Sequence, residues 1–147
     1  MQSPIDIPTG ESDYFVNVDK PILVALADGR DYEKIEISNN GYTINVKGDL
    51  GSLTLFPHNV AYKATQLHFH LPSEHRINGE AYDMEMHVIC SISDESDLSS
   101  PVTPNLVLVY FFKMDRNVKD NEFLNHIFDD GKYPSMSEVF QNTLKLN

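Results

Sequence analysis

The residues from Gln66 to His70 alternate strictly between polar and apolar side chains. Because successive side chains of a β-strand point to opposite faces, this alternation predicts a strand over 64–70 with one polar face and one apolar face. Gln66, His68 and His70 share the polar face, and the residues between them share the apolar one. The segment therefore predicts part of a sheet that displays two imidazoles side by side.

A second strand is predicted over 81–91, where Glu85 and His87 share one face and methionine and valine side chains lie opposite. If this strand and the first are antiparallel neighbours, three imidazoles meet in one cavity. The side chains of Gln66 and Glu85, which form hydrogen bonds, then lie in the same cavity.

Other short alternating runs, separated by turn residues, predict strands over 22–26 and 42–46. The run 106–114 is apolar with no polar residue before Lys113, which predicts a strand buried on both faces in the centre of a sheet.

Apolar residues at helical spacing predict two helices, over 119–128 and over 135–146. Residues 1–13 contain Pro, Gly and Ser without helical periodicity, which predicts an extended segment lying over the domain. Together these elements predict a mainly β chain with a few short helices (α+β). No linker divides it, so one domain is expected over 1–147.

The composition is that of a globular chain, with 147 residues of which 41% are hydrophobic and 22% are charged. A formal net charge of −11 repels phosphate backbones and anionic lipids, which argues against nucleic acid and membrane surfaces as partners. No apolar run reaches the roughly 18 residues of a membrane-spanning helix, and the first residues do not resemble a signal peptide. The compartment stays open. Cys90, the single cysteine, is expected to be a small buried hydrophobic residue.

The histidine pattern suits a catalytic zinc site. Three neutral imidazoles leave one tetrahedral position of Zn²⁺ open for water, and zinc lowers the pKa of that water to about 7. Metal-bound imidazoles usually donate their other N–H to a carboxylate or an amide, and Gln66 and Glu85 suit that role. From the residues alone, however, an ordinary pleated strand with one hydrated face is an equal alternative.

The segment 66–89 closely resembles the zinc-site signature of the α-class carbonic anhydrases, and shorter matches agree in order. The matching residues are Gln66-Leu67-His68-Phe69-His70-Leu71-Pro72-Ser73-Glu74-His75, Ile77-Asn78-Gly79-Glu80, Glu85-Met86-His87-Val88-Ile89, Gln2-Ser3-Pro4-Ile5 and Asn39-Asn40-Gly41. The run 106–113 resembles the long central strand of that family. The resemblance implies a twisted, mostly antiparallel sheet.

The resemblance also implies individual roles. The implied zinc ligands and their hydrogen-bonding neighbours are His68, His70 and His87, with Gln66 and Glu85. Glu74 matches a buried glutamate that accepts a hydrogen bond from a threonine hydroxyl and so orients the hydroxide on zinc. Ile89 and Val107 match the apolar wall where carbon dioxide lies.

Two departures from the family pattern affect these expectations. Tyr42 stands where many active members have a histidine that shuttles protons, and a phenol with a pKa near 10 relays protons poorly at neutral pH. The chain ends at Asn147, whereas the family continues and includes the threonine that pairs with Glu74. The domain is therefore expected to be partial, with its sheet incomplete on the C-terminal side.

Three functions agree with these observations. The first is a carbonic anhydrase that interconverts carbon dioxide and bicarbonate, although the activity of this chain alone stays open. The second is a catalytically impaired zinc-binding or structural subunit of a larger assembly, and the third is one half of a split enzyme. Because an unfinished sheet exposes unpaired backbone groups, we expect a protein partner to cover its edge.

Overall fold

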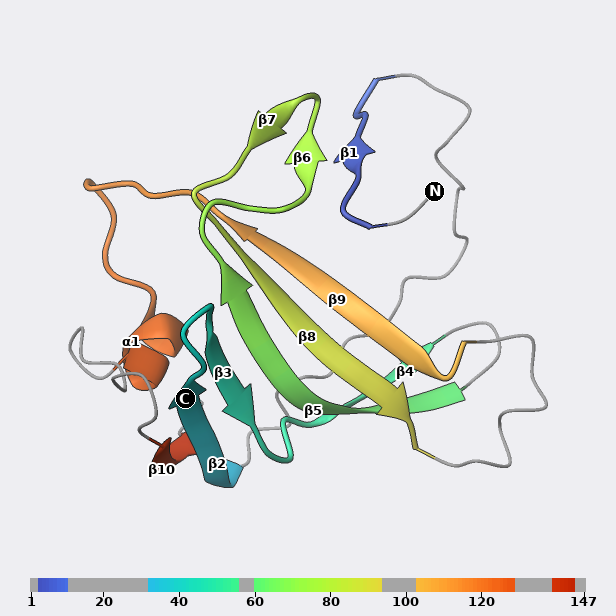
Figure 1. Cartoon of the computed structure of the whole chain (residues 1–147), viewed down its shortest axis with the longest axis vertical. Helices are drawn as coiled ribbons and strands as arrows, with labels where there is room; N and C mark the ends of the chain where they lie inside the picture. Colours follow the sequence, from blue (N-terminus) through green and yellow to red (C-terminus); the bar gives the residue numbers. More distant parts are fainter. Residues whose placement is uncertain (1–2, 11–31, 56–59, 94–102, 129–138, 145–147) are drawn as a thin grey trace.

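The computed structural model describes residues 3–10, 32–55, 60–93, 103–128 and 139–144. Its main feature is a seven-stranded sheet in which every pairing is antiparallel (Figure 1). The strand order is β10-β2-β3-β5-β8-β9, and β4 pairs with β5 beside this path. The strands are β2 (Tyr32–Asn39), β3 (Ile44–Lys47), β4 (Ser52–Leu55), β5 (Val60–His70), β8 (Met84–Ile92), β9 (Asn105–Phe112) and β10 (Val139–Leu144).

A small three-stranded sheet joins the start of the chain to the segment between β5 and β8. It contains β1 (Asp6–Ile7), β6 (Arg76–Ile77) and β7 (Glu80–Ala81), with β1 parallel to β6. Asn78 and Gly79 form the turn of the β6–β7 hairpin with φ values of 52° and 81°. Positive φ at both positions is typical of a tight hairpin turn, for which Asn-Gly is the preferred sequence.

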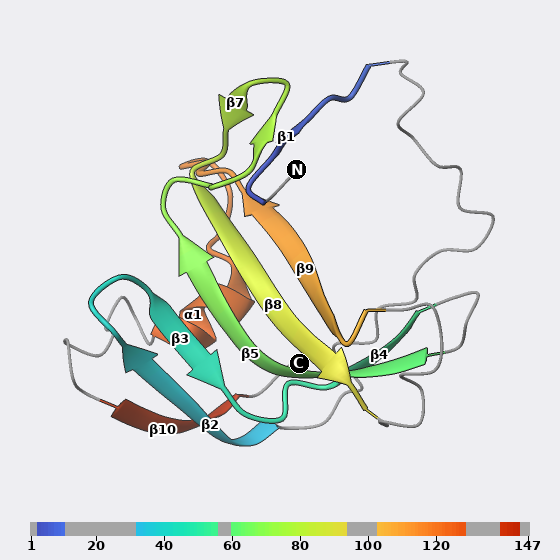
Figure 2. The same ribbon diagram turned by 45° about the vertical axis from the view of Figure 1, so that its right-hand side comes forward.

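The hydrophobic core lies on one face of the main sheet, against the helix α1 (Glu122–Phe128). In Figure 2 the helix is seen behind the strands of the sheet. Ile127 of α1 is 2% exposed, and the rings of Phe69 and Phe128 are 5.4 Å apart. Buried side chains of β5 and β8, such as Leu67 and Val88, complete this face. The opposite face of these two strands is therefore available for the polar residues of the alternating pattern. Among the described residues, no helix is long and apolar enough to cross a membrane.

Several predictions about local structure are confirmed. The segments 64–70 and 81–91 form most of β5 and β8, and the two strands are antiparallel neighbours. The helix predicted over 119–128 is present over the shorter range of α1. The strand predicted over 42–46 begins only at Ile44, because residues 40–43 form a turn closed by the hydrogen bond from the Asn40 N–H to the Thr43 carbonyl. The predicted strand 22–26 lies outside the described residues.

The helix predicted over 135–146 is wrong, since residues 139–144 form β10 and pair with β2. Val139, Phe140 and Thr143 favour strands, and the edge of β2 offers backbone partners that outweigh a helical spacing of apolar residues.

The prediction that 106–114 is a central, doubly buried strand is also wrong for the described part of the chain. β9 pairs with β8 alone and lies at the edge of the sheet. Val107 and Tyr110 are 46% and 37% exposed. A continuous apolar run shows that the side chains are apolar. It does not show whether the strand has one neighbouring strand or two.

Candidate metal centre

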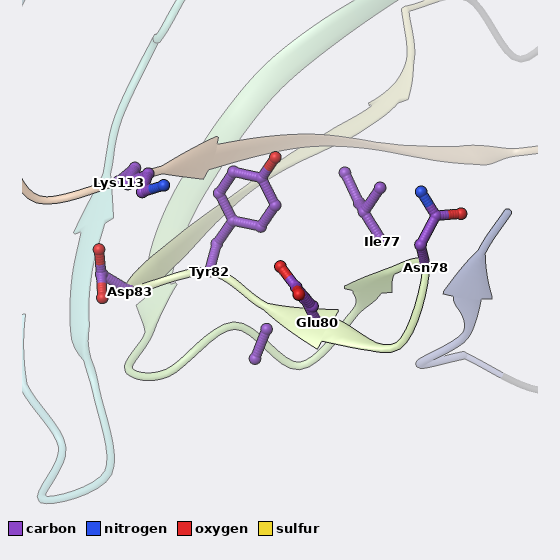
Figure 3. Close-up of a pocket in the computed structure, with 7 residues that line it drawn as sticks. Ile77, Asn78, Glu80, Tyr82, Asp83 and Lys113 are labelled. Carbon is purple, nitrogen blue, oxygen red and sulfur yellow. The ribbon is translucent and has the colours of Figure 1, made fainter. Parts of the chain in front are cut away.

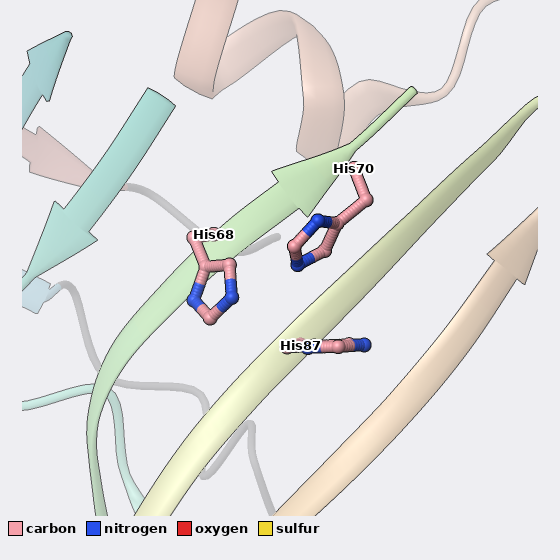
Figure 4. A group of neighbouring side chains, drawn as sticks. All are labelled: His68, His70 and His87. Atoms are coloured by element: carbon pink, nitrogen blue, oxygen red, sulfur yellow. The ribbon is translucent and has the colours of Figure 1, made fainter. Parts of the chain in front are cut away.

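The three histidines of the sequence pattern are brought together by the register of β5 and β8. His68 lies directly opposite His87, and His70 lies opposite Glu85. The side chains of His68 and His70 from β5 and of His87 from β8 gather on one side of the sheet (Figure 4). The predicted convergence is therefore confirmed as geometry.

The ring centroids of His68 and His70 are 5.0 Å apart, those of His68 and His87 are 5.2 Å apart, and those of His70 and His87 are 4.6 Å apart. Each residue offers one ring nitrogen, and these three nitrogens lie within 4.8 Å of one another. Three nitrogen donors in one cluster are the ligand set of an open, tetrahedral zinc site.

Two nitrogens of the cluster are buried without a hydrogen-bond partner, namely Nδ1 of His68 and Nε2 of His70. Buried polar atoms of proteins nearly always have a hydrogen-bond partner, so two buried ring nitrogens without one are unusual and need a physical explanation. In His87 the Nε2 atom bonds to Glu85, so Nδ1 is the ring nitrogen that this bond leaves available to a metal. A cation that accepts lone pairs from imidazoles fits this donor set.

The electrostatics of the cluster favour neutral imidazole, which is the form that binds metals. Burial lowers the pKa of His68 below its ordinary value of 6.5, and the neighbouring His70 and His87 lower it further. The carboxylate of Glu74 acts in the opposite direction. The cluster thus resists protonation at His68 without help from a bound ion.

Glu85 is completely buried beside the cluster and accepts three hydrogen bonds. The donors are Nε2 of His87, Nδ1 of His75 at 2.5 Å and the backbone N–H of His75 at 2.9 Å. Burial acts to raise the pKa of Glu85, but the bonds from His87 and His75 outweigh it and lower that pKa below 4.5. The expected hydrogen bond between Glu85 and an imidazole of the cluster is present at His87.

The sequence pattern does not indicate a role for His75. It lies within the quoted signature, but it follows a turn and shares no strand periodicity with the three clustered histidines. With Glu85 and His87 it forms a second group of potential metal ligands. Because these residues are already hydrogen-bonded to one another, we interpret the group as support for His87.

Gln66 does not bond to an imidazole of the cluster in this structure. Its Nε2 atom donates to Oδ1 of Asn45 at 3.2 Å, and Nδ1 of His68 has no partner. The reason lies in the neighbouring strand, since β3 pairs with β5 and places Asn45 directly opposite His68. Strand spacing alone cannot reveal that competing partner.

Glu74 is not buried among the described residues, as its side chain is 43% exposed. Its Oε1 atom lies 3.4 Å from Nδ1 of His70. Glu74 therefore contacts the cluster through His70.

Tyr42 lies away from the histidines. Its side chain is 98% exposed and borders an apolar groove with Phe69, Met84 and Phe128, which belong to the core side of the sheet. Because Tyr42 belongs to the turn at residues 40–43, its side chain does not follow the alternation of β3, which begins at Ile44. The structure thus gives no support to a proton-relay position at Tyr42.

Ile89 and Val107 lie opposite each other on β8 and β9, and Gln66 lies opposite Ile89 on β5. This row of residues is next to the row that contains His68 and His87. The two apolar side chains therefore border the cluster on the polar face of the sheet.

A separate pocket lies beside the β6–β7 hairpin and contains none of the clustered histidines. It has a volume of about 400 Å³ and is lined by residues that include Glu80, Tyr82, Asp83 and Lys113 (Figure 3). Most of its polar groups are exposed, and Asp83 already accepts a hydrogen bond from the backbone of Met114. The histidine cluster is therefore the better candidate for a functional site.

Comparison with known proteins gives a consistent result. The family model for eukaryotic-type carbonic anhydrase matches residues 1–146. Carbonic anhydrase Nec1 of Nesocodon mauritianus is 34% identical over 114 residues, which cover 76% of this chain and 36% of that protein. Alpha carbonic anhydrase 6 of Arabidopsis thaliana is 46% identical over 55 residues, which cover 36% of this chain and 20% of that protein.

Among solved structures, the fungal alpha carbonic anhydrase of Aspergillus oryzae superposes with a TM-score of 0.71 and 25% identity. The match covers 97% of this chain and 55% of that one. The chain thus spans about half the length of that structure and a smaller share of the curated relatives.

Proposed function

Because this chain belongs to the eukaryotic-type carbonic anhydrase family, we propose that it binds one zinc ion and supports the reversible hydration of carbon dioxide to bicarbonate and a proton. The ligands in this proposal are His68, His70 and His87. The observation that carries it is the convergence of three imidazoles with two buried nitrogens that have no hydrogen-bond partner.

The residues around the cluster would each contribute to holding the metal. Zinc bound at such a site makes a water molecule acidic enough to supply hydroxide as a nucleophile at neutral pH. Glu85 accepts a hydrogen bond from Nε2 of His87 and so keeps Nδ1 of that ring free as a ligand. Glu74 faces Nδ1 of His70, which leaves the orphaned Nε2 of that ring as the other ligand atom.

The apolar side chains beside the cluster suit carbon dioxide as the substrate. Ile89 and Val107 border the ligand face and offer no charge or hydrogen bond, so they favour a small apolar molecule over an ion. The proton released by hydration must leave the site, and Tyr42 borders the groove on the core side of the sheet, which contains none of the clustered histidines. We therefore expect turnover to depend on the buffer concentration.

A second candidate is a zinc-binding subunit without activity of its own, or one half of an enzyme completed by another polypeptide. Two observations favour it: Glu74 is exposed, and β9 has no neighbour on its outer side among the described strands. The Ile92 N–H donates to the Pro104 carbonyl, so the alternation of an antiparallel pair turns the backbone groups of Val107, Val109 and Phe111 outward. A partner strand could bind there.

Metal analysis and a carbon dioxide hydration assay separate these candidates. Both are run on the chain alone and on any complex purified with it, with His87→Ala as the control that removes one ligand. Our proposal predicts about one zinc per chain and activity that is absent in the control. Stoichiometric zinc without hydration activity in either sample would favour the second candidate, and absence of zinc after zinc-replete purification would contradict both.

A further inference from the structure

A chain of hydrogen bonds connects the N-terminal segment to the histidine cluster. It runs from the Ser3 hydroxyl through His75 and Glu85 to His87. We propose that Ser3 and His75 are positioning residues for the metal site, which makes metal affinity depend on docking of the N-terminal segment. This inference rests on the proposed zinc ligation by His87.

The direction of each bond follows from counting donors. Glu85, as a carboxylate, has only acceptor atoms, so the ring nitrogens that contact it must carry protons. His87 then has its proton on Nε2, and the lone pair of its Nδ1 is available to a metal. His75 likewise has a proton on Nδ1, which lies 2.5 Å from Oε1 of Glu85.

Ser3 completes this arrangement at the outer end. Its Oγ atom lies 2.9 Å from Nε2 of His75. When Nδ1 of a neutral imidazole carries the proton, Nε2 is an acceptor, so the Ser3 hydroxyl donates to it. The hydroxyl therefore favours the tautomer of His75 that donates to Glu85. Because His75 is only 8% exposed, water has little access to replace this donor.

The N-terminal segment is held in place by backbone bonds next to His75. The N–H groups of Arg76 and Asn78 donate to the carbonyls of Ile5 and Ile7, each at 3.1 Å. These bonds place Ser3 beside His75. The backbone next to His75 thus binds the N-terminal segment, while the side chain of His75 supports Glu85 and, through it, His87. Docking of the segment and the orientation of His87 should therefore stabilise each other.

The test measures zinc affinity by competition with a chelator in wild type, Ser3→Ala, Ser3→Thr and Ser91→Ala. Ser91→Ala is the matched control, because it removes a hydroxyl that bonds to Asn105 on the surface. We expect Ser3→Ala to weaken zinc binding about three- to ten-fold, the effect of losing one hydrogen bond. Ser3→Thr, which keeps the hydroxyl, and the control should bind as wild type does.

Two further measurements complement the zinc affinity, and the first of them needs no zinc. Imidazole nitrogen shifts of the metal-free chain should show a proton on Nδ1 of His75 and none on Nε2. Hydrogen exchange at the amides of Arg76 and Asn78 should slow when zinc is added to wild type, and slow less in Ser3→Ala.

The outcomes separate this inference from the proposed function. A wild-type chain that binds no zinc refutes the proposed function itself. If wild type binds zinc but Ser3→Ala binds it equally well, with exchange slowed to the same extent, the inference is wrong. If Ser3→Ala does not fold, the tautomer of His75 in wild type decides, and a proton on Nε2 overturns the proposal.

Discussion

Replacing Glu85 with Gln tests the support of the metal site with the smallest change in shape. The side chain is completely buried and accepts three hydrogen bonds, two at Oε1 and one at Oε2. An amide oxygen in the Oε1 position keeps the two bonds from His75 and His87. The amide NH₂ then faces the backbone N–H of His75, so two donors meet and one buried donor loses its acceptor.

The expected cost follows from these contacts. A buried donor without an acceptor costs about 1–3 kcal/mol, and bonds to a neutral oxygen are weaker than bonds to a carboxylate. Relief from burying the charge offsets part of this, so we expect the free energy of unfolding of the metal-free chain to fall by about 2 kcal/mol. Loss of the carboxylate behind His87 should weaken zinc binding about 10–100-fold.

Urea unfolding of the metal-free chain and chelator competition for zinc measure the two effects separately. Glu122→Gln is the control, because Glu122 is an exposed residue whose side chain pairs with Lys119 on the surface. It should change neither quantity appreciably. If Glu85→Gln keeps both the stability and the zinc affinity of wild type, the assignment of Glu85 as the support of His87 is refuted.

Three further predictions concern other parts of the molecule. Tyr62 is fully buried and donates to the Thr103 carbonyl at 2.7 Å, so Tyr62→Phe should lower the free energy of unfolding by about 1 kcal/mol in urea titrations. Tyr42→His should leave carbon dioxide hydration unchanged in both weak and concentrated buffer, since the side chain borders the groove on the core side; a gain in weak buffer alone would show that position 42 does relay protons. The metal-free chain should lose stability as the pH falls. The unfolded state takes up a proton at His68 below about 6.5 while the folded state resists it, and protonation of Glu85 adds a further loss as the pH falls below its unfolded value near 4.5. Equal unfolding free energies at pH 7.5 and pH 5 would contradict the lowered pKa of His68.

The clustering of the three histidines could be predicted from the sequence because strand geometry has a period of two. His68 and His70 had to share a face once their segment was a strand, and His87 joined them once β5 and β8 were antiparallel neighbours. The pairing itself could not be derived from spacing, and the resemblance to a known signature supported it.

Other features depend on partners that no local pattern records. His75 reaches Glu85 from a turn, where neither helical nor strand periodicity applies. Gln66 has the strand spacing of a hydrogen-bonding neighbour of His68, yet its amide donates to Asn45 on a third strand. The apolar residues of β10 fit both a helix and a strand, and pairing with the edge of β2 favours the strand.

The contact between Ser3 and His75 also bears on the order in which the chain folds. Its two residues are 72 positions apart, whereas the three clustered histidines come from β5 and β8, which are separated in the sequence only by the segment that contains β6 and β7. Closing a long loop costs more chain entropy than closing a short one, so the pairing of β5 with β8 should form early and the N-terminal segment should dock late. A refolding chain should therefore bind zinc weakly at first. Its zinc affinity should rise when the N-terminal segment docks.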